Sequence, residues 1–162
     1  MKQEIACAFK GKKQEKLMLE ITERQYICIQ LEDKNEKTKA ALYAKYFLQN
    51  STDIECSSSF TVHIETIKVD RKYRRKKIAT LMFQTLINQL LQIEKKMKCA
   101  FVYIYGEVGK DGGDNPRLSM PFYRSLHEYS FGEKRKMVLR ITEGKSMDGL
   151  DSFCYYIVCT GK

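Results

Sequence analysis

The sequence predicts a mixed α/β fold, formed as a single domain over residues 1–162. Segments that alternate apolar and polar residues predict a twisted, mostly antiparallel sheet. A long amphipathic segment in the middle of the chain predicts a helix on that sheet, and a shorter helix is expected nearer the C-terminus. The length suffices for one hydrophobic core.

The expected strands are residues 3–10, 16–22, 25–32, 40–48, 60–69, 99–105, 137–141 and 153–159. The alanine content of 40–48 leaves a helix open there. In 60–69 the alternation places Val62, Ile64 and Thr66 on one face. His63, Glu65, Ile67 and Val69 then lie on the other face.

Two segments have helical features. Residues 78–97 carry apolar side chains at helical spacing and end with Glu94-Lys95-Lys96. The dipeptide Asn115-Pro116 is a good helix start, and this second helix is expected to reach about Glu128. Pro121 lies inside it and indicates either a kink or a later start.

Composition and charge indicate which class of partner the chain binds. The chain is 43% hydrophobic and 30% charged, as in an ordinary soluble globular protein, and its net charge is +9. Seven basic residues and one acid lie between Lys68 and Lys77. The excess favours an anionic partner such as a cofactor phosphate, a nucleic acid or an acidic surface. No apolar run approaches a membrane span and the start lacks a signal peptide, so no membrane partner is predicted and the cytoplasm is the expected location.

Six cysteines are scattered without a C-x-x-C pair, so no metal site is predicted. Cys7, Cys28, Cys99 and Cys154 lie in apolar segments and are expected to be buried thiols.

The most informative segment is Val69 to Ala79, where an expected strand meets a cationic turn and then the long helix. The first backbone N–H groups of a helix have no internal partner, and the helix dipole adds positive potential there. Strand, cationic turn and helix start therefore predict a phosphate site.

This segment resembles the acetyl-CoA signature of the GNAT superfamily of N-acetyltransferases. That signature is Arg or Gln, two residues, Gly, one residue, then Gly or Ala, between a strand and the following long helix. Here Arg74 and Ala79 fit, and Lys77 stands where the family prefers glycine. A lysine at that position keeps the amide contact with the pyrophosphate only if its φ is ordinary and its side chain turns outward.

A second motif strengthens the resemblance. Asn115 and Phe122-Tyr123, with Tyr129 or Phe131 after a turn, are similar to the family's later helix. Pro121-Phe122-Tyr123 looks most like the arylalkylamine N-acetyltransferase branch. The resemblance covers about residues 60–131, and the two helices that usually follow the family's first strand are not apparent.

The resemblance implies a GNAT-like fold, acetyl-CoA as cosubstrate and transfer of its acetyl group to a primary amine. The pyrophosphate is then expected on the backbone amides of the turn, and the pantetheine arm pairs with the strand like an added strand. The implied cofactor-binding residues are Ile67, Val69, Arg74, Arg75, Lys76, Lys77, Ile78, Ala79, Thr80 and Asn115.

An amine with a pKa of about 10 is mostly protonated at neutral pH, so a general base helps. Glu65 is the first candidate for the base and His63 the second, with water as a third route. Tyr123 matches the family's general acid, which protonates the thiolate that leaves.

The acceptor is a small molecule, or a peptide or protein if the site is open or completed by a second subunit of a homodimer. Two other functions remain open. One is a degenerate relative that binds coenzyme A without turnover. The other is a module that binds nucleic acid or an acidic partner through Arg71 to Lys77.

Overall fold

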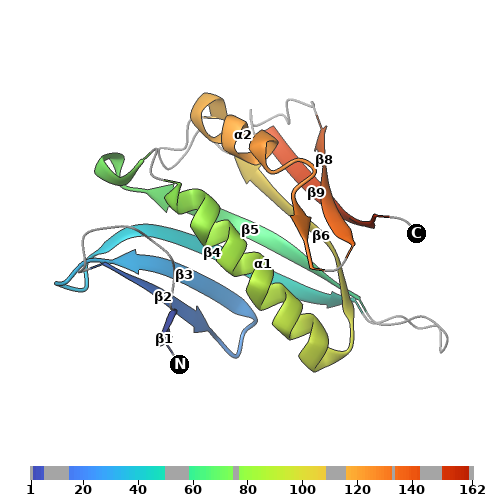
Figure 1. Ribbon diagram of the computed structural model, residues 1–162, viewed down its shortest axis with the longest axis horizontal. Helices are drawn as coiled ribbons and strands as arrows, with labels where there is room; N and C mark the ends of the chain where they lie inside the picture. The colour runs from blue at the N-terminus through green and yellow to red at the C-terminus, as the bar shows by residue number, and fades with distance from the viewer. Residues whose placement is uncertain are drawn as a thin grey trace. The chain divides into compact units, whose positions relative to one another are not determined.

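A computed structural model of the chain describes residues 2–5, 15–49, 59–74, 77–108, 116–132, 134–142 and 151–160. Within these ranges it contains nine β-strands, a 3-10 turn and two α-helices (Figure 1). The strands are β1 Lys2–Ile5, β2 Lys16–Ile21, β3 Tyr26–Glu32, β4 Thr38–Gln49, β5 Ser59–Val69, β6 Ala100–Val108, β7 Ser130–Phe131, β8 Arg135–Thr142 and β9 Asp151–Cys159. The others are the 3-10 turn η1 Arg71–Tyr73 and the helices α1 Ile78–Met97 and α2 Pro116–Ser125.

Hydrogen-bonded strands follow the order β1-β2-β3-β4-β5-β6-β9-β8-β7. The chain divides into two compact units, Met1–Phe47 with Ile64–Lys96 and Leu48–His63 with Met97–Lys162. The division falls inside β5, between His63 and Ile64. The second half of β5 therefore belongs with β1–β4, and its first half belongs with β6–β9.

The core of the first unit lies between α1 and one face of its sheet (Figure 1). β2, β3 and β4 pair antiparallel in sequence order, so alternate residues share a face. On the α1 face the large apolar side chains are at most 1% exposed: Leu17, Leu19, Ile27, Ile29, Leu31 and Leu42. α1 contributes Met82, Phe83, Leu86 and Leu90, all 0% exposed. Burial of these two apolar faces is the main force that holds the unit together.

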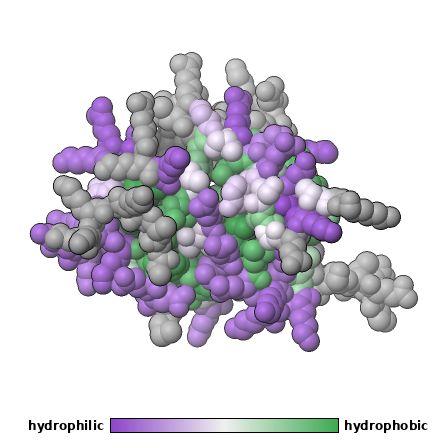
Figure 2. Space-filling model, in the orientation of Figure 1, coloured by the Kyte–Doolittle hydropathy of each residue, from purple (hydrophilic) through white to green (hydrophobic). Residues whose placement is uncertain are grey.

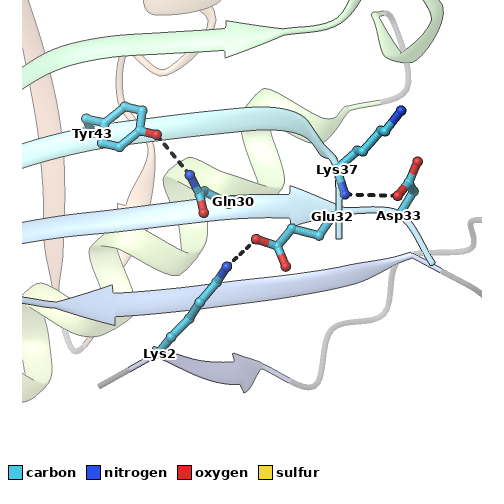
Figure 3. Close-up of polar contacts among 6 residues, drawn as sticks. All are labelled: Lys2, Gln30, Glu32, Asp33, Lys37 and Tyr43. Carbon is cyan, nitrogen blue, oxygen red and sulfur yellow. Dashed lines mark hydrogen bonds and ion pairs between the residues drawn. The ribbon is translucent and has the colours of Figure 1, made fainter. Parts of the chain in front are cut away.

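The opposite face of this unit is polar (Figure 3). Gln30 Nε2 donates to the Tyr43 hydroxyl at 2.9 Å, and Lys2 forms an ion pair with Glu32. Asp33 holds the β3–β4 turn, because its Oδ1 accepts from the Lys37 N–H at 3.0 Å. That bond is the main reason the pKa of the Asp33 carboxyl lies below its usual value.

β4 decides the open question at residues 40–48 in favour of a strand. Its alanines pair with β3, with Ala41 opposite Gln30 and Ala44 opposite Ile27. Ala44 and Leu42 are both 0% exposed. Alanine favours a helix in isolation, but pairing and burial against the core outweigh that preference.

The second unit is built around β6, β9 and β8, which pair antiparallel. α2 packs on one face of β9, where the Tyr123 and Phe153 rings stack with centroids 3.9 Å apart. The buried Tyr155 hydroxyl donates to the Tyr123 carbonyl oxygen. Burial raises the pKa of Tyr155 far above its usual value, so this hydroxyl stays a donor at physiological pH.

The predicted fold class is confirmed: a mixed, mostly antiparallel sheet flanked by a long helix and a shorter one. α1 has the predicted bounds, and α2 begins at Pro116 and continues through Pro121, so the later start is wrong. The expected strand 3–10 is described only as β1, since residues 6–14 lie outside the described part of the chain. The two-residue β7 and the 3-10 turn were not predicted. That the chain forms one domain stays a prediction.

Hydrophilic side chains make up most of the face that Figure 2 shows, and hydrophobic ones are visible between them. No helix in the described ranges is long and apolar enough to cross a membrane.

Truncating Leu42, which is 0% exposed in the core of the first unit, should leave a cavity. We expect Leu42→Ala to lower the free energy of unfolding by about 2–5 kcal/mol in urea titrations. The control is Leu48→Ala on the same strand, where the side chain is 42% exposed and the loss should stay within about 0.5 kcal/mol. Equal losses for the two variants would contradict the assigned core face of β4.

Candidate cofactor and catalytic residues

The turn between β5 and α1 is fixed by backbone hydrogen bonds. The Asp70 N–H donates to the Lys39 carbonyl of β4 at 2.8 Å. The Tyr73 N–H donates to the Asp70 carbonyl, also at 2.8 Å, and closes η1. The Tyr73 hydroxyl is hydrogen-bonded to the Glu15 carboxylate, which raises the pKa of Tyr73. The turn is therefore held by contacts with β4 and with the segment before β2.

Arg74 ties the turn to the end of the strand. Its Nε donates to the Val69 carbonyl at 3.1 Å, and its side chain is otherwise exposed. A guanidinium has five N–H donors, so this bond leaves four for an anion. Arg74 thus shapes the turn and still presents positive charge beside it.

Lys77 has φ 57°, which lies in the left-handed region. The condition of an ordinary φ for an amide contact at Lys77 is therefore not met, and the helix amides available for a phosphate begin at Ile78. The left-handed conformation costs a residue with a Cβ about 1 kcal/mol, whereas glycine adopts it freely. Five other non-glycine residues of the described ranges share a positive φ, so the angle alone marks a turn. Lys77 occupies the glycine position of the signature, and its positive φ is a physical reason why glycine is preferred at that position.

α1 begins directly after Lys77. The Leu81 N–H donates to the Lys77 carbonyl at 3.0 Å, which makes Lys77 the N-cap. The N–H groups of Ile78, Ala79 and Thr80 precede the first internal donor and face the turn. Ile78 is buried and anchors the helix, whereas Ala79 and Thr80 are half-buried.

The charge around this helix start is positive. The first turn of α1 has no acidic residue. Five cationic side chains near it are exposed: Lys68, Arg71, Lys72, Arg74 and Lys77. Asp70 is the exposed acid among them. Unpaired amides, the helix dipole and these cations together favour a polyanion such as a pyrophosphate.

The backbone of β5 next to the turn points in a defined direction. Consecutive residues of a strand point their N–H and C=O groups to opposite sides. Because the Asp70 N–H points to β4, the corresponding groups of Val69 and Ile67 point away from β4. The resemblance implies that the pantetheine arm pairs with these two strand residues.

The proposed base residues lie on β5 as predicted. Val62 and Ile64 are buried at 0% and 2% exposure, whereas Glu65 is exposed and His63 half-buried. The His63 ring stacks on Tyr105 of β6 with centroids 4.9 Å apart. The alternation that separates Val62 and Ile64 from His63 and Glu65 is confirmed, and Glu65 is exposed on its face of the strand.

Tyr123 is 6% exposed and is held by its stacking on Phe153 and by an edge contact with Phe122 at 5.2 Å. It lies on the α2 face of the second unit, whereas His63 and Tyr105 lie on the opposite face. This follows because Tyr105 pairs with Cys154, and Phe153 is the adjacent residue of β9. His63 and Tyr123 are therefore not in contact, and their roles stay predictions.

Three predicted residues, Arg75, Lys76 and Asn115, lie outside the described part of the chain. Sequence reasoning missed Tyr105 and Tyr103, although the alternation in Tyr103-Ile104-Tyr105 is the signal that places both rings on one face. Among the described residues no group of three or more metal-ligating side chains comes together.

No family model and no curated protein sequence matches the chain. A bacterial toxin of known structure aligns over 82% of this chain and 67% of its own, with TM-score 0.53 and 10% identity. Arabidopsis thaliana NAA60 in complex with a bisubstrate analogue aligns over 83% of this chain and 77% of its own, with TM-score 0.46 and 18% identity. The NatC complex bound to Gag peptide and CoA aligns over 82% and 70%, with TM-score 0.43 and 12% identity. The toxin likeness concerns the fold alone, and the two with TM-scores below 0.5 say nothing further about this chain.

Replacing Lys77 by glycine should relieve the left-handed strain. We expect Lys77→Gly to unfold at the same temperature as the parent chain or higher, with a gain of at most about 1 kcal/mol. Lys77→Ala removes the charge but keeps the Cβ, so it should bring no gain. Thermal unfolding by circular dichroism measures both. A clear loss of stability in Lys77→Gly would contradict the positive φ.

Proposed function

We propose that the chain is an acetyl-CoA-dependent N-acetyltransferase that acts on a primary amine. The observation that carries the proposal is the N-terminus of α1, whose first amides follow an exposed cationic turn and the left-handed Lys77 at the glycine position of the signature. A backbone of this shape presents the first amides of a helix to a pyrophosphate at close range.

In this proposal the phosphates of coenzyme A bind the amides of Ile78, Ala79 and Thr80. Arg74 supplies charge-assisted hydrogen bonds through its remaining donors, and Arg75, Lys76 and Lys77 add positive charge. Asn115 is assigned to the cofactor on the resemblance alone.

The pantetheine arm lies along the second half of β5 as an added strand. The backbone groups of Ile67 and Val69 point away from β4, which supports this placement. The Val69 carbonyl already accepts from Arg74, so the cofactor would use the Val69 N–H there. No metal takes part in this scheme.

The reaction is direct attack in a ternary complex. Glu65, directly or through water, removes a proton from the acceptor ammonium, with His63 as the alternative base. The neutral amine attacks the thioester carbon, the C–S bond breaks and the thiolate leaves. Tyr123 donates its phenolic proton to that thiolate. The attacking nitrogen loses its second proton as the amide forms, and this proton returns to the Tyr123 phenolate through water. The acceptor is a small molecule or the amine of a peptide or protein.

Cofactor binding is tested by thermal shift. Acetyl-CoA should raise the melting temperature, because a ligand that binds only the native state stabilises it by mass action. Ala79→Leu should weaken the shift by crowding the phosphates, and Leu48→Ala is the matched control that should keep it. No shift with millimolar acetyl-CoA would rule out the acetyltransferase proposal. A normal shift without thiol release on any amine would instead indicate a degenerate, CoA-binding relative.

Tyr123→Phe removes the hydroxyl and keeps the stacking on Phe153. If Tyr123 is the acid, kcat should fall by about 10- to 1000-fold with little change in cofactor affinity. Tyr129→Phe, in the turn after α2, is the control and should leave kcat unchanged. An unaltered kcat in Tyr123→Phe, with chemistry shown to limit the rate, would remove the acid role.

Glu65→Gln should lower the rate most at neutral pH. The defect should shrink as the pH rises toward the pKa of the acceptor, about 10, because more amine is then already neutral. The pH–rate profile measures this, with Glu107→Gln of β6, an exposed carboxylate like Glu65, as control. A defect of equal size at every pH would make Glu65 a positioning residue and pass the base role to His63 or water.

A further inference from the structure

A continuous line of aromatic rings crosses the sheet of the second unit. His63 of β5 stacks on Tyr105 of β6 at 4.9 Å, and Tyr105 contacts Tyr103 at 5.7 Å. Tyr103 contacts Tyr156 of β9 at 6.1 Å. The line ends on β8, where the Arg140 guanidinium lies 5.4 Å from the centre of the Tyr156 ring. We call these four rings, His63, Tyr105, Tyr103 and Tyr156, the aromatic stripe.

The stripe lies on the face of the sheet opposite α2. α2 packs on Phe153 through Tyr123, and the stripe residue Tyr156 is on the other side of β9 with Cys154. Tyr156 is 44% exposed, and the other three rings are half-buried. In the described part of the second unit no helix covers these rings.

Aromatic side chains usually bury themselves, so a line of half-buried and exposed rings that no described helix covers indicates a binding surface. Here the His63 and Tyr105 rings stack, the next rings are tilted against one another, and the Arg140 guanidinium lies over the Tyr156 ring. The stripe is therefore preordered, and a ligand that stacks on it has little side-chain freedom to remove.

The charges beside the stripe select its ligand. β8 carries Arg135, Lys136 and Arg140 and no acidic residue. Lys136 and Arg140 share the face of the stripe, on either side of Val138, which pairs with Tyr156. Lys136 also forms an ion pair with Glu128 at 3.1 Å. The described carboxylate of β6, Glu107, lies beyond Tyr105 at the other end of the stripe.

We propose that the aromatic stripe binds single-stranded nucleic acid, with bases stacked on the rings and the phosphate backbone along β8. Rings that accept any base face, combined with cations along one side, are the features of surfaces that bind single strands without sequence preference. The net charge of +9 favours the same polyanion. Glu107 keeps phosphates from the Tyr105 end, which orients the strand. The stripe shares His63 with the proposed acetyl transfer, in which His63 is the alternative base, so the test uses Tyr103 and Tyr156.

The test is fluorescence anisotropy of the full chain with a labelled single-stranded oligothymidylate at low salt. Tyr156→Ala and Tyr103→Ala should each weaken binding about fivefold or more, the lower end of the effect of one stacked base. Tyr156→Phe keeps the ring and should bind like the parent chain. The matched control is Tyr26→Ala, because Tyr26 in the first unit also carries a cation, Lys45 Nζ, 5.0 Å from its ring centre.

Several outcomes of the binding measurements would overturn the proposal. Absence of binding at micromolar protein would do so directly. Equal losses of oligonucleotide affinity in Tyr26→Ala and Tyr156→Ala would show that the bases do not stack on the rings of the stripe in particular. Duplex of the same length bound as tightly, or an acidic peptide that competes as well as the oligonucleotide, would assign binding to charge alone. Unfolding temperatures of the stripe variants equal to that of the parent chain would show that these variants fold.

Discussion

The abrupt change from strand to helix between Val69 and Ile78 constrains the rest of the first unit. β5 pairs with β4 as far as Asp70, whose N–H binds the Lys39 carbonyl, and α1 must then start in the direction that lays its apolar face on the sheet. Between these residues the chain passes through η1, and Arg74 donates a hydrogen bond to the Val69 carbonyl. Lys77 then has a left-handed backbone conformation. The first amides of α1, directly after Lys77, have no partner within the helix. The start of the helix and the proposed phosphate site thus depend on one backbone conformation.

The cost of that conformation at a lysine is modest beside the burial that it permits. Four side chains of α1, Met82, Phe83, Leu86 and Leu90, are completely buried, and each contributes about 1.5–3 kcal/mol. Left-handed strain of about 1 kcal/mol at one residue is easily offset by this packing. The departure from glycine therefore affects the shape of the turn little. Its main consequence is one more exposed charge beside the proposed phosphate site.

The spacing of apolar residues along the chain predicted α1 and the two faces of β5. Helical spacing gave the bounds of α1, and the alternation in β5 separated the buried Val62 and Ile64 from His63 and Glu65. The conformation of Lys77 was not predictable, because lysine rarely takes a positive φ and only the packing of α1 imposes it. The stacking of His63 on Tyr105 depends on two strands that the fold brings together. The alanines of β4 became a strand because β3 lies beside them.

The two faces of the second unit's sheet have different chemistry. One face holds α2 through Tyr123, Phe153 and the buried Tyr155, and it supplies the proposed acid. The other carries the aromatic stripe and the cations of β8. Strand alternation alone makes this possible, since neighbouring residues of β9 serve opposite faces. One short strand thereby supports both an apolar core and an exposed surface for recognition.

The central claim is that the amides at the start of α1 hold the phosphates of coenzyme A. The most direct measurement is a map of backbone amide chemical shifts during titration of the isotope-labelled chain with acetyl-CoA. The account predicts the largest shifts at Ile78, Ala79 and Thr80, with smaller ones at Ile67 and Val69. Saturable binding that leaves the amides of Ile78, Ala79 and Thr80 unshifted would contradict it.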